Sequence, residues 1–186
     1  MTLNSSQLRK MDEERALAIR HIIKRRPVYL ILEDILDTYN IGGFFRLADA
    51  VAAEKVYLCG ESATPPNPKI TKASVGTYKL VPWEYRSSAA AAIKELQKIK
   101  KMKVIAVEQH PGSKDYRKIK YHLPLAVVFG NETAGIKPET LKLVDNIAEI
   151  PMHGFNKSLN VMVAAGIILY QALKGQKGMI SANSAS

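Results

Sequence analysis

Short apolar runs alternate along the chain with longer segments of helical period. Runs of strand length occupy residues 28–33, 55–59, 77–82, 103–107, 125–129 and 147–150. Helices are predicted over residues 4–26, 41–53, 87–101, 138–144 and 158–174, and 64–68 is a Pro-rich loop. Alternation of strands with helices predicts an α/β fold, a mostly parallel sheet with helices on both faces.

The pattern divides the 186 residues into one domain with two short additions. Residues 27–175 are predicted to form the domain. Residues 1–26 form a basic N-terminal helical extension that ends in Lys24, Arg25 and Arg26 before Pro27. Residues 176–186 are small and polar, and a flexible tail is predicted there.

Composition narrows the function classes. A formal net charge of +10 favours an anionic partner, with nucleic acid the commonest, although a basic surface that only aids solubility is the alternative. The lone Cys59 cannot form an internal disulfide, and the four dispersed histidines lack metal-ligand spacing. No apolar run reaches the roughly 18 residues of a membrane span, and the N-terminus has no apolar signal region. We therefore expect a cytoplasmic protein without a metal.

Ligands of parallel sheets bind beyond the carboxyl ends of the strands. The first polar constellation there is NIGGFFRLADA at residues 40–50. Asn40 is a suitable helix N-cap, and the glycine pair that follows allows close backbone approach. Arg46 lies in an otherwise apolar helix, where a guanidinium near a helix N-terminus forms a suitable phosphate clamp. Pairing of Arg46 with Asp49 one turn on is the alternative.

Two further constellations follow later strands. In VFGNETAGI, residues 128–136, Gly130 permits a tight turn, and Asn131 and Glu132 put polar groups at the mouth of a strand. A plain strand–helix turn is the alternative. In IPMHGFNKSLNV, residues 150–161, a helix opens around Ser158, and Asn160 needs a polar partner at the start of a long apolar helix. Neither a Walker motif nor GxGxxG occurs, which disfavours a dinucleotide-binding oxidoreductase.

In this order and spacing, the three segments resemble the motifs of the SpoU (TrmH) family of RNA 2′-O-ribose methyltransferases, within the SPOUT superfamily. The resemblance covers roughly residues 27 to 173. It implies a sheet whose C-terminal part forms a deep trefoil knot, S-adenosyl-L-methionine as cofactor, and a homodimer whose active site is completed across the interface. The dimer element would be the last helix, through Val163, Ile167 and Tyr170.

The resemblance also implies roles for individual residues. The cofactor-binding residues would be Val107, Glu108, Gly130, Asn131, Ile150, Met152, Ser158 and Leu159. The catalytic set would be Arg46, Asn40, Glu132, Ser158 and Asn160, and the RNA-binding residues Lys24, Arg25, Arg26 and Arg46. Because a guanidinium stays protonated in proteins, we interpret Arg46 as a phosphate clamp that stabilises the ribose alkoxide rather than as a base.

The expected reaction is methyl transfer from S-adenosyl-L-methionine to a ribose 2′-hydroxyl of RNA. The short basic N-terminal helix resembles the tRNA-modifying members, which favours tRNA over rRNA and a guanosine in the D-loop. Modification of rRNA or of the tRNA wobble ribose is the alternative. A non-catalytic RNA-binding protein of the same fold is a second one, disfavoured by the complete set of polar motif residues.

Overall fold

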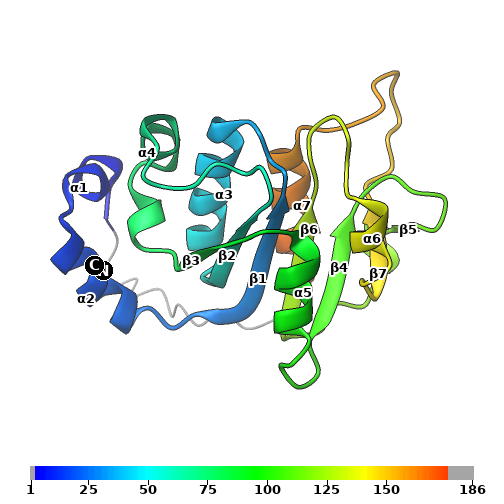
Figure 1. Ribbon diagram of the computed structural model, residues 1–186, viewed down its shortest axis with the longest axis horizontal. Helices are drawn as coiled ribbons and strands as arrows, with labels where there is room; N and C mark the ends of the chain where they lie inside the picture. Colours follow the sequence, from blue (N-terminus) through cyan, green and yellow to red (C-terminus); the bar gives the residue numbers. More distant parts are fainter. Residues whose placement is uncertain (1–2, 176–186) are drawn as a thin grey trace.

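The computed structural model describes residues 3–175, and the tail predicted for residues 176–186 lies outside them (Figure 1). Within the described residues, seven strands form one sheet in the order β3-β2-β1-β6-β4-β7-β5, and every pairing is parallel. The strands are β1 Arg26–Glu33, β2 Ala53–Cys59, β3 Trp83–Arg86, β4 Lys103–Val107, β5 Lys114–Asp115, β6 Leu125–Phe129 and β7 Asn146–Glu149. The prediction of a mostly parallel sheet is confirmed.

Helices precede, connect and follow these strands. They are α1 Ser5–Lys10, α2 Glu13–Ile22, α3 Thr38–Ala50, α4 Pro68–Ser74, α5 Ala89–Leu96, α6 Pro138–Leu141 and α7 Val161–Ala172, with 3-10 turns η1 Thr77–Lys79 and η2 Tyr116–Lys118. In Figure 1, α1 and α2 lie at the β3 end of the sheet and β5 lies at the other end.

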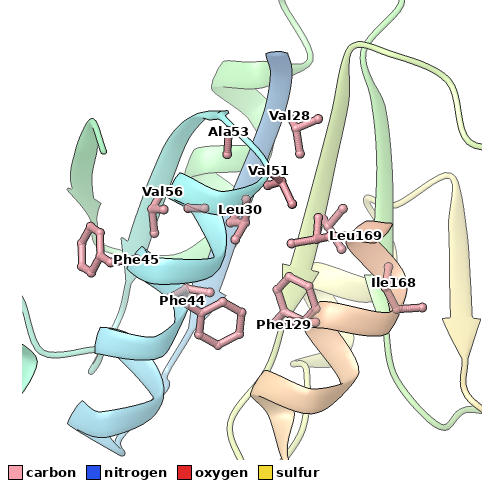
Figure 2. Packing of buried hydrophobic residues seen from close by; sticks show 14 of the residues in the cluster. Val28, Leu30, Phe44, Phe45, Val51, Ala53, Val56, Phe129, Ile168 and Leu169 are labelled. Atoms are coloured by element: carbon pink, nitrogen blue, oxygen red, sulfur yellow. The ribbon is translucent and has the colours of Figure 1, made fainter. Parts of the chain in front are cut away.

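The sheet buries apolar side chains on both faces, as the alternation along β1 shows. Leu30 and Leu32 belong to a cluster with residues of α3 and α7, among them Phe44 and Leu169 (Figure 2). Ile31, between them in sequence, belongs to a second cluster with residues of α5. Successive side chains of a strand point to opposite faces, so helices cover both faces of the sheet as predicted.

Predicted helix ends shift by a few residues, as in α3 and α5, and three elements show further differences. The single helix over residues 4–26 is wrong, because Met11 has extended backbone and Asp12 caps a second helix by accepting from the Arg15 amide. The strand over 77–82 is also wrong: Thr77–Lys79 form η1, and pairing with β2 starts only at Trp83. The last helix begins at Val161 rather than near 158, because Asn160 is its N-cap.

The carboxyl ends of the central strands meet at one edge. Phe129 of β6 is in register with Leu32 of β1 and with Val107 of β4, and Val107 is in register with Ala148 of β7. The loops after β1, β4, β6 and β7 therefore leave the sheet side by side, which brings the three polar constellations together. Among the described residues, no helix is long and apolar enough to span a membrane.

Candidate active site

A pocket of about 550 Å³ opens at this edge of the sheet. The eight residues predicted to bind the cofactor all line it: Val107, Glu108, Gly130, Asn131, Ile150, Met152, Ser158 and Leu159. Its lining also includes Glu132 and Asn160 from the predicted catalytic set. Segments that lie up to about fifty positions apart in the chain thus form one concave surface, as the carboxyl-end rule predicts.

Two glycines let the loop after β6 close on itself at the pocket wall. Asn131 and Gly135 form an antiparallel bridge, and a Cβ on Gly130 would lie 2.5 Å from the Gly135 carbonyl carbon. Gly135 has a φ of +70°, and a Cβ there would collide with the Glu108 carboxylate. That carboxylate accepts the Ile136 amide at 2.9 Å. A Cβ at position 130 would enter space that the loop backbone occupies, and the positive φ at position 135 disfavours any residue with a Cβ, so both positions favour glycine.

The side chain of Asn131 stabilises the same loop through hydrogen bonds to backbone groups. Its Oδ1 accepts the amides of Thr133 and Ala134 at 2.9 and 2.8 Å, and its Nδ2 donates to the Asp34 carbonyl at 2.8 Å. The side chain thus fixes its own turn and joins it to the end of β1. The plain strand–helix turn that the sequence left open does not describe this geometry, because the loop is bonded across the sheet edge.

Glu132 faces the loop after β1. Its carboxylate accepts the amides of Leu36 and Asp37 at 3.3 and 3.4 Å and the Asn40 Nδ2 at 2.9 Å. Asn40 Oδ1 in turn accepts from Asn160 Nδ2 at 3.2 Å. The side chains of Glu132, Asn40 and Asn160 therefore form one chain of hydrogen bonds that links the three motifs.

The caps of the two flanking helices differ from the prediction in detail. Asp37, not Asn40, caps α3, with its carboxylate accepting the Tyr39 amide at 2.8 Å. Asn40 lies in the first turn of α3 and is 7% exposed. Asn160 caps α7 through the Met162 amide at 2.9 Å. Because Asp37 caps α3, the side-chain amide of Asn40 can bond to Glu132 of the second motif and to Asn160 of the third.

Arg46 lies apart from the pocket. It is exposed on α3, six residues beyond Asn40, and a helix rises about 1.5 Å per residue, so the two lie about 9 Å apart along the axis. Among residues 3–175, the structure shows no ion pair between Arg46 and Asp49. Burial raises the pKa of Asp49, and the opposing charge beside it is that of Arg25. The alternative pairing of Arg46 is therefore absent from the described part of the chain.

The basic segment before β1 lies at the opposite end of the sheet. β1 spans eight residues at about 3.3 Å each, which places Arg26 roughly 23 Å from Glu33 and the pocket. The Arg25 guanidinium donates to the carbonyls of Ala53 and Leu80 at 2.9 and 2.6 Å, and burial lowers its pKa. Lys24 is exposed. Arg25 lies beside Asp49, one helical turn beyond Arg46 on α3, whereas the pocket lies at the other end of the strands.

Ten further pocket residues were not among the site residues predicted from the sequence. They are Gln109, Phe129, Thr133, Ala134, Gly135, Ala148, Glu149, Asn156, Val161 and Ala164. Half of them directly follow or precede a predicted position, and the rule that ligands bind beyond strand ends could have found Gln109 and Glu149. Gln109 also donates through Nε2 to the Lys157 carbonyl, which ties the loop after β4 to the loop before α7.

The donor set of the pocket suits an organic ligand. In the part of the chain that the structure describes, no group of three or more His, Cys, Asp or Glu side chains is placed to hold a metal ion. The walls combine apolar side chains, such as Val107 and Leu159, with polar ones such as Asn131. Apolar walls with a few placed polar groups are what a flat heteroaromatic ligand requires.

Comparison with known proteins identifies relatives over most of the chain. Residues 27–170 match the SpoU rRNA Methylase family. The tRNA (guanosine(18)-2′-O)-methyltransferase of Aquifex aeolicus is 31% identical over 94% of this chain and 83% of its own length. The 23S rRNA (guanosine-2′-O-)-methyltransferase RlmB of Ralstonia nicotianae is 30% identical, covering 86% of this chain and 63% of its own.

Solved structures agree with this match. The SpoU methyltransferase AviRb from Streptomyces viridochromogenes, in complex with the cofactor AdoMet, superposes with a TM-score of 0.73 at 27% identity. The match covers 81% of this chain and 58% of that one. This chain thus spans about three fifths of some larger relatives and most of the tRNA-modifying one. With the family matched over most of its length and the three motifs joined at one pocket, the chain belongs to the SpoU methylase family.

Proposed function

We propose that this protein transfers a methyl group from S-adenosyl-L-methionine to a ribose 2′-hydroxyl of RNA. The observation that carries the proposal is the hydrogen-bonded chain Glu132–Asn40–Asn160, which lies against a pocket lined by all eight predicted cofactor residues. A protein that only binds RNA has no need of such a pocket. The relatives named above as RNA ribose methyltransferases support the same reading.

The residues present fit S-adenosyl-L-methionine. Gly130 and Gly135 allow the tight turn of the loop at the pocket wall, which we call the glycine cradle, and the lining combines apolar side chains with polar ones such as Asn131. When bound, the cofactor supplies an electrophilic methyl group on a sulfonium. Backbone groups of the loops after β4, β6 and β7 would hold it, together with Met152 and Leu159. A deep trefoil knot formed by these C-terminal segments is part of the proposal.

Glu132 acts in this scheme as a positioning residue. Its two carboxylate oxygens already accept three donors, from Leu36, Asp37 and Asn40. Acceptors committed in this way hold an adjacent amide in place and are poorly suited to take a proton. We therefore assign Asn40 to orient the ribose, with Glu132 and Asn160 fixing its side chain. Ser158, exposed in the loop before α7, would order that loop at the pocket.

Arg46 is assigned to the phosphate beside the reacting ribose. A charged guanidinium can bind two phosphate oxygens and stabilise the developing alkoxide. Because Arg46 lies along α3 and outside the pocket of its own chain, the proposal places it in a site completed by a second copy. The last helix offers the surface for such a homodimer, since Val163 and Tyr170 of α7 are 52% and 61% exposed.

A guanosine in the D-loop of tRNA is the favoured target, and a cytoplasmic location fits it. Support comes from the relative named for guanosine 18, whose length this chain nearly spans, and from the basic extension with Lys24. An rRNA guanosine is the second candidate, favoured by the match to the 23S rRNA enzyme. Incubation of tRNA and rRNA with methyl-labelled cofactor tests the proposal, and it fails if no label enters either RNA.

A further inference from the structure

Asp34, directly after β1, has a backbone conformation that needs support. Its φ is +52°, and the residue is 9% exposed. Asp tolerates the left-handed region better than most residues because its short polar side chain can bond locally. The Asp34 amide donates to the Cys59 carbonyl at 3.1 Å, and the Asp34 carbonyl accepts Asn131 Nδ2 at 2.8 Å. The backbone of Asp34 is therefore a direct support for the pocket loop.

The carboxylate of Asp34 has two partners. It accepts the Glu61 amide at 2.8 Å and pairs with Lys137 Nζ at 2.6 Å. Its side chain is 12% exposed, whereas that of Lys137 is 49% exposed. Burial opposes ionisation, but the bonds from Lys137 and Glu61 outweigh it and hold the pKa of Asp34 below its usual value. The ion pair is thus partly shielded from solvent.

Lys137 is also fixed through its backbone. Its amide donates to Glu33 Oε2 at 3.0 Å, and the buried Thr140 hydroxyl donates to Glu33 Oε1 at 2.6 Å. Two consecutive carboxylates at the end of β1 therefore hold the start of α6. The loop that carries Asn131 and Glu132 runs from β6 to this anchor.

The contacts between the two loops follow one another in order. Asn131 bonds to position 34, and Glu132 bonds to positions 36, 37 and 40. The last contact of the loop after β6 is the ion pair between Lys137 and Asp34. We propose that the Asp34–Lys137 ion pair is a positioning element that sets the cofactor loop 130–137 against the substrate loop 34–40. The kinetic part of this inference rests on the proposed function, whereas the structural part does not.

The test uses four variants of the full chain. Lys137→Met keeps an unbranched side chain and the hydrogen bond from the backbone amide of residue 137 to Glu33, but it removes the cation. Lys137→Arg restores a cation, Asp34→Asn removes the charge while keeping an acceptor for Glu61, and the double variant Asp34→Asn/Lys137→Met removes both charges. Lys142→Met, at an exposed lysine just beyond α6, is the matched control.

Amide hydrogen exchange by NMR gives a readout independent of activity. The amides of Leu36, Asp37, Thr133 and Ala134 all bond to the side chains of Asn131 or Glu132. In Lys137→Met their exchange is expected to accelerate about tenfold, while a core amide in β4 keeps its rate. Lys142→Met leaves all of them unchanged. Equal acceleration of the β4 amide, or none in the loops, overturns the inference.

Kinetics then test the catalytic consequence. Lys137→Met should lower kcat for RNA methylation about tenfold with KM for RNA nearly unchanged, since small displacements of aligned groups slow the reaction. Lys137→Arg should recover most of that loss, and the double variant should lose less than the two single losses combined. A loss of kcat that Lys137→Arg does not restore would overturn the inference. If the loop amides exchange faster in Lys137→Met but the wild-type protein does not methylate RNA, the proposed function is refuted and the positioning role of the ion pair still holds.

Discussion

The Nδ2 of Asn40 donates a hydrogen bond of 2.9 Å to Oε1 of Glu132, although the two residues lie 92 positions apart in the chain. The bond joins the helix that carries Arg46 to the loop that forms the pocket wall. Because Asn40 also accepts from Asn160 at 3.2 Å, an amide with both ends occupied is fixed in one orientation. Because Glu132 and Asn160 both line the pocket, the three motifs together fix the position of the Asn40 side chain beside it.

Two substitutions of Asn160 separate its structural role from its role at the site. Asn160→Asp keeps an oxygen that caps α7 but loses the donor to Asn40 and places a negative charge near Glu132. We expect wild-type thermal stability and at least about tenfold slower methylation. Asn160→Ala loses the cap as well, which costs about 1 kcal/mol and lowers Tm by about 3 °C for a chain of this size.

Thermal melts and single-turnover methylation of RNA measure these effects. Wild-type activity of Asn160→Asp would contradict the assigned role of the Asn40–Asn160 bond. An equal loss of stability in both variants would show that the bond to Asn40, which both variants lose, and not the cap, accounts for the contribution of Asn160 to stability.

The glycine cradle predicts a loss of cofactor affinity on adding one methyl group. Gly130→Ala places a Cβ 2.5 Å from the backbone of Gly135, so the loop must move away from its bonded position. Overpacking of this kind costs about 1–3 kcal/mol, and we expect S-adenosyl-L-methionine to bind at least about tenfold more weakly. Calorimetry measures the dissociation constant.

Gly154→Ala is the control for the cradle. Gly154 lies in the loop before α7, and a Cβ there would meet nothing within 4 Å. We expect wild-type cofactor affinity for this variant. Unchanged affinity in Gly130→Ala would mean that the cofactor binds elsewhere than the cradle.

Arg25 and its neighbour Lys24, both predicted from the sequence to bind RNA, should behave differently. Arg25→Ala leaves the carbonyls of Ala53 and Leu80 without their charged donor. Bonds of this type are worth about 1.5–3 kcal/mol, so the free energy of unfolding should fall by roughly 2 kcal/mol. Lys24→Ala should leave stability unchanged, weaken RNA binding and reduce the slope of log affinity against log salt by about 1.

Denaturant titration and RNA binding at several salt concentrations separate the two outcomes. A destabilised Lys24→Ala, or an Arg25→Ala variant as stable as the wild type, would contradict this division.

The buried Cys59 should be unreactive in the folded protein. Burial raises the pKa of its thiol to about 12, with the Glu33 carboxylate adding to the shift. The folded state therefore keeps the proton that an unfolded thiol loses above pH 9, and this contribution to stability is present below that pH and declines as pH rises towards 12. Ellman's reagent at pH 8 should react only after unfolding. Rapid reaction of the native protein would contradict this burial.

The strand pattern could be predicted because buried parallel strands are short continuous apolar runs, as in Lys103–Val107 and Leu125–Phe129. The helix boundaries could not be predicted as well, because each depends on one N-cap residue and the hydrophobic periodicity does not show which polar residue caps the helix. Asp12 divides the N-terminal extension into two helices, and Asn160 sets the start of α7. The helix α4, capped by Asn67, follows a Pro-rich loop and has too few residues for a visible period.

The site was predictable where a motif carries side-chain chemistry, and less so where backbone does the work. Glu132, Asn40 and Asn160 are polar at the ends of apolar elements, so they stand out and do meet. Ala134 and Ala164 line the pocket without any polar signature. Arg25 looked like a free surface charge because nothing local shows that its guanidinium bonds to carbonyls 28 and 55 positions away.

Mass-spectrometric mapping of nucleosides shows whether this protein methylates a ribose of RNA. Unmodified tRNA and rRNA are incubated with the protein and S-adenosyl-L-methionine bearing a deuterated methyl group, then digested to nucleosides. We expect labelled 2′-O-methylguanosine from tRNA with the wild type. We expect none with Arg46→Ala, although that variant binds the cofactor with wild-type affinity, because Arg46 lies outside the pocket. Label on a base instead of a ribose, or full activity of Arg46→Ala, would contradict the proposed function.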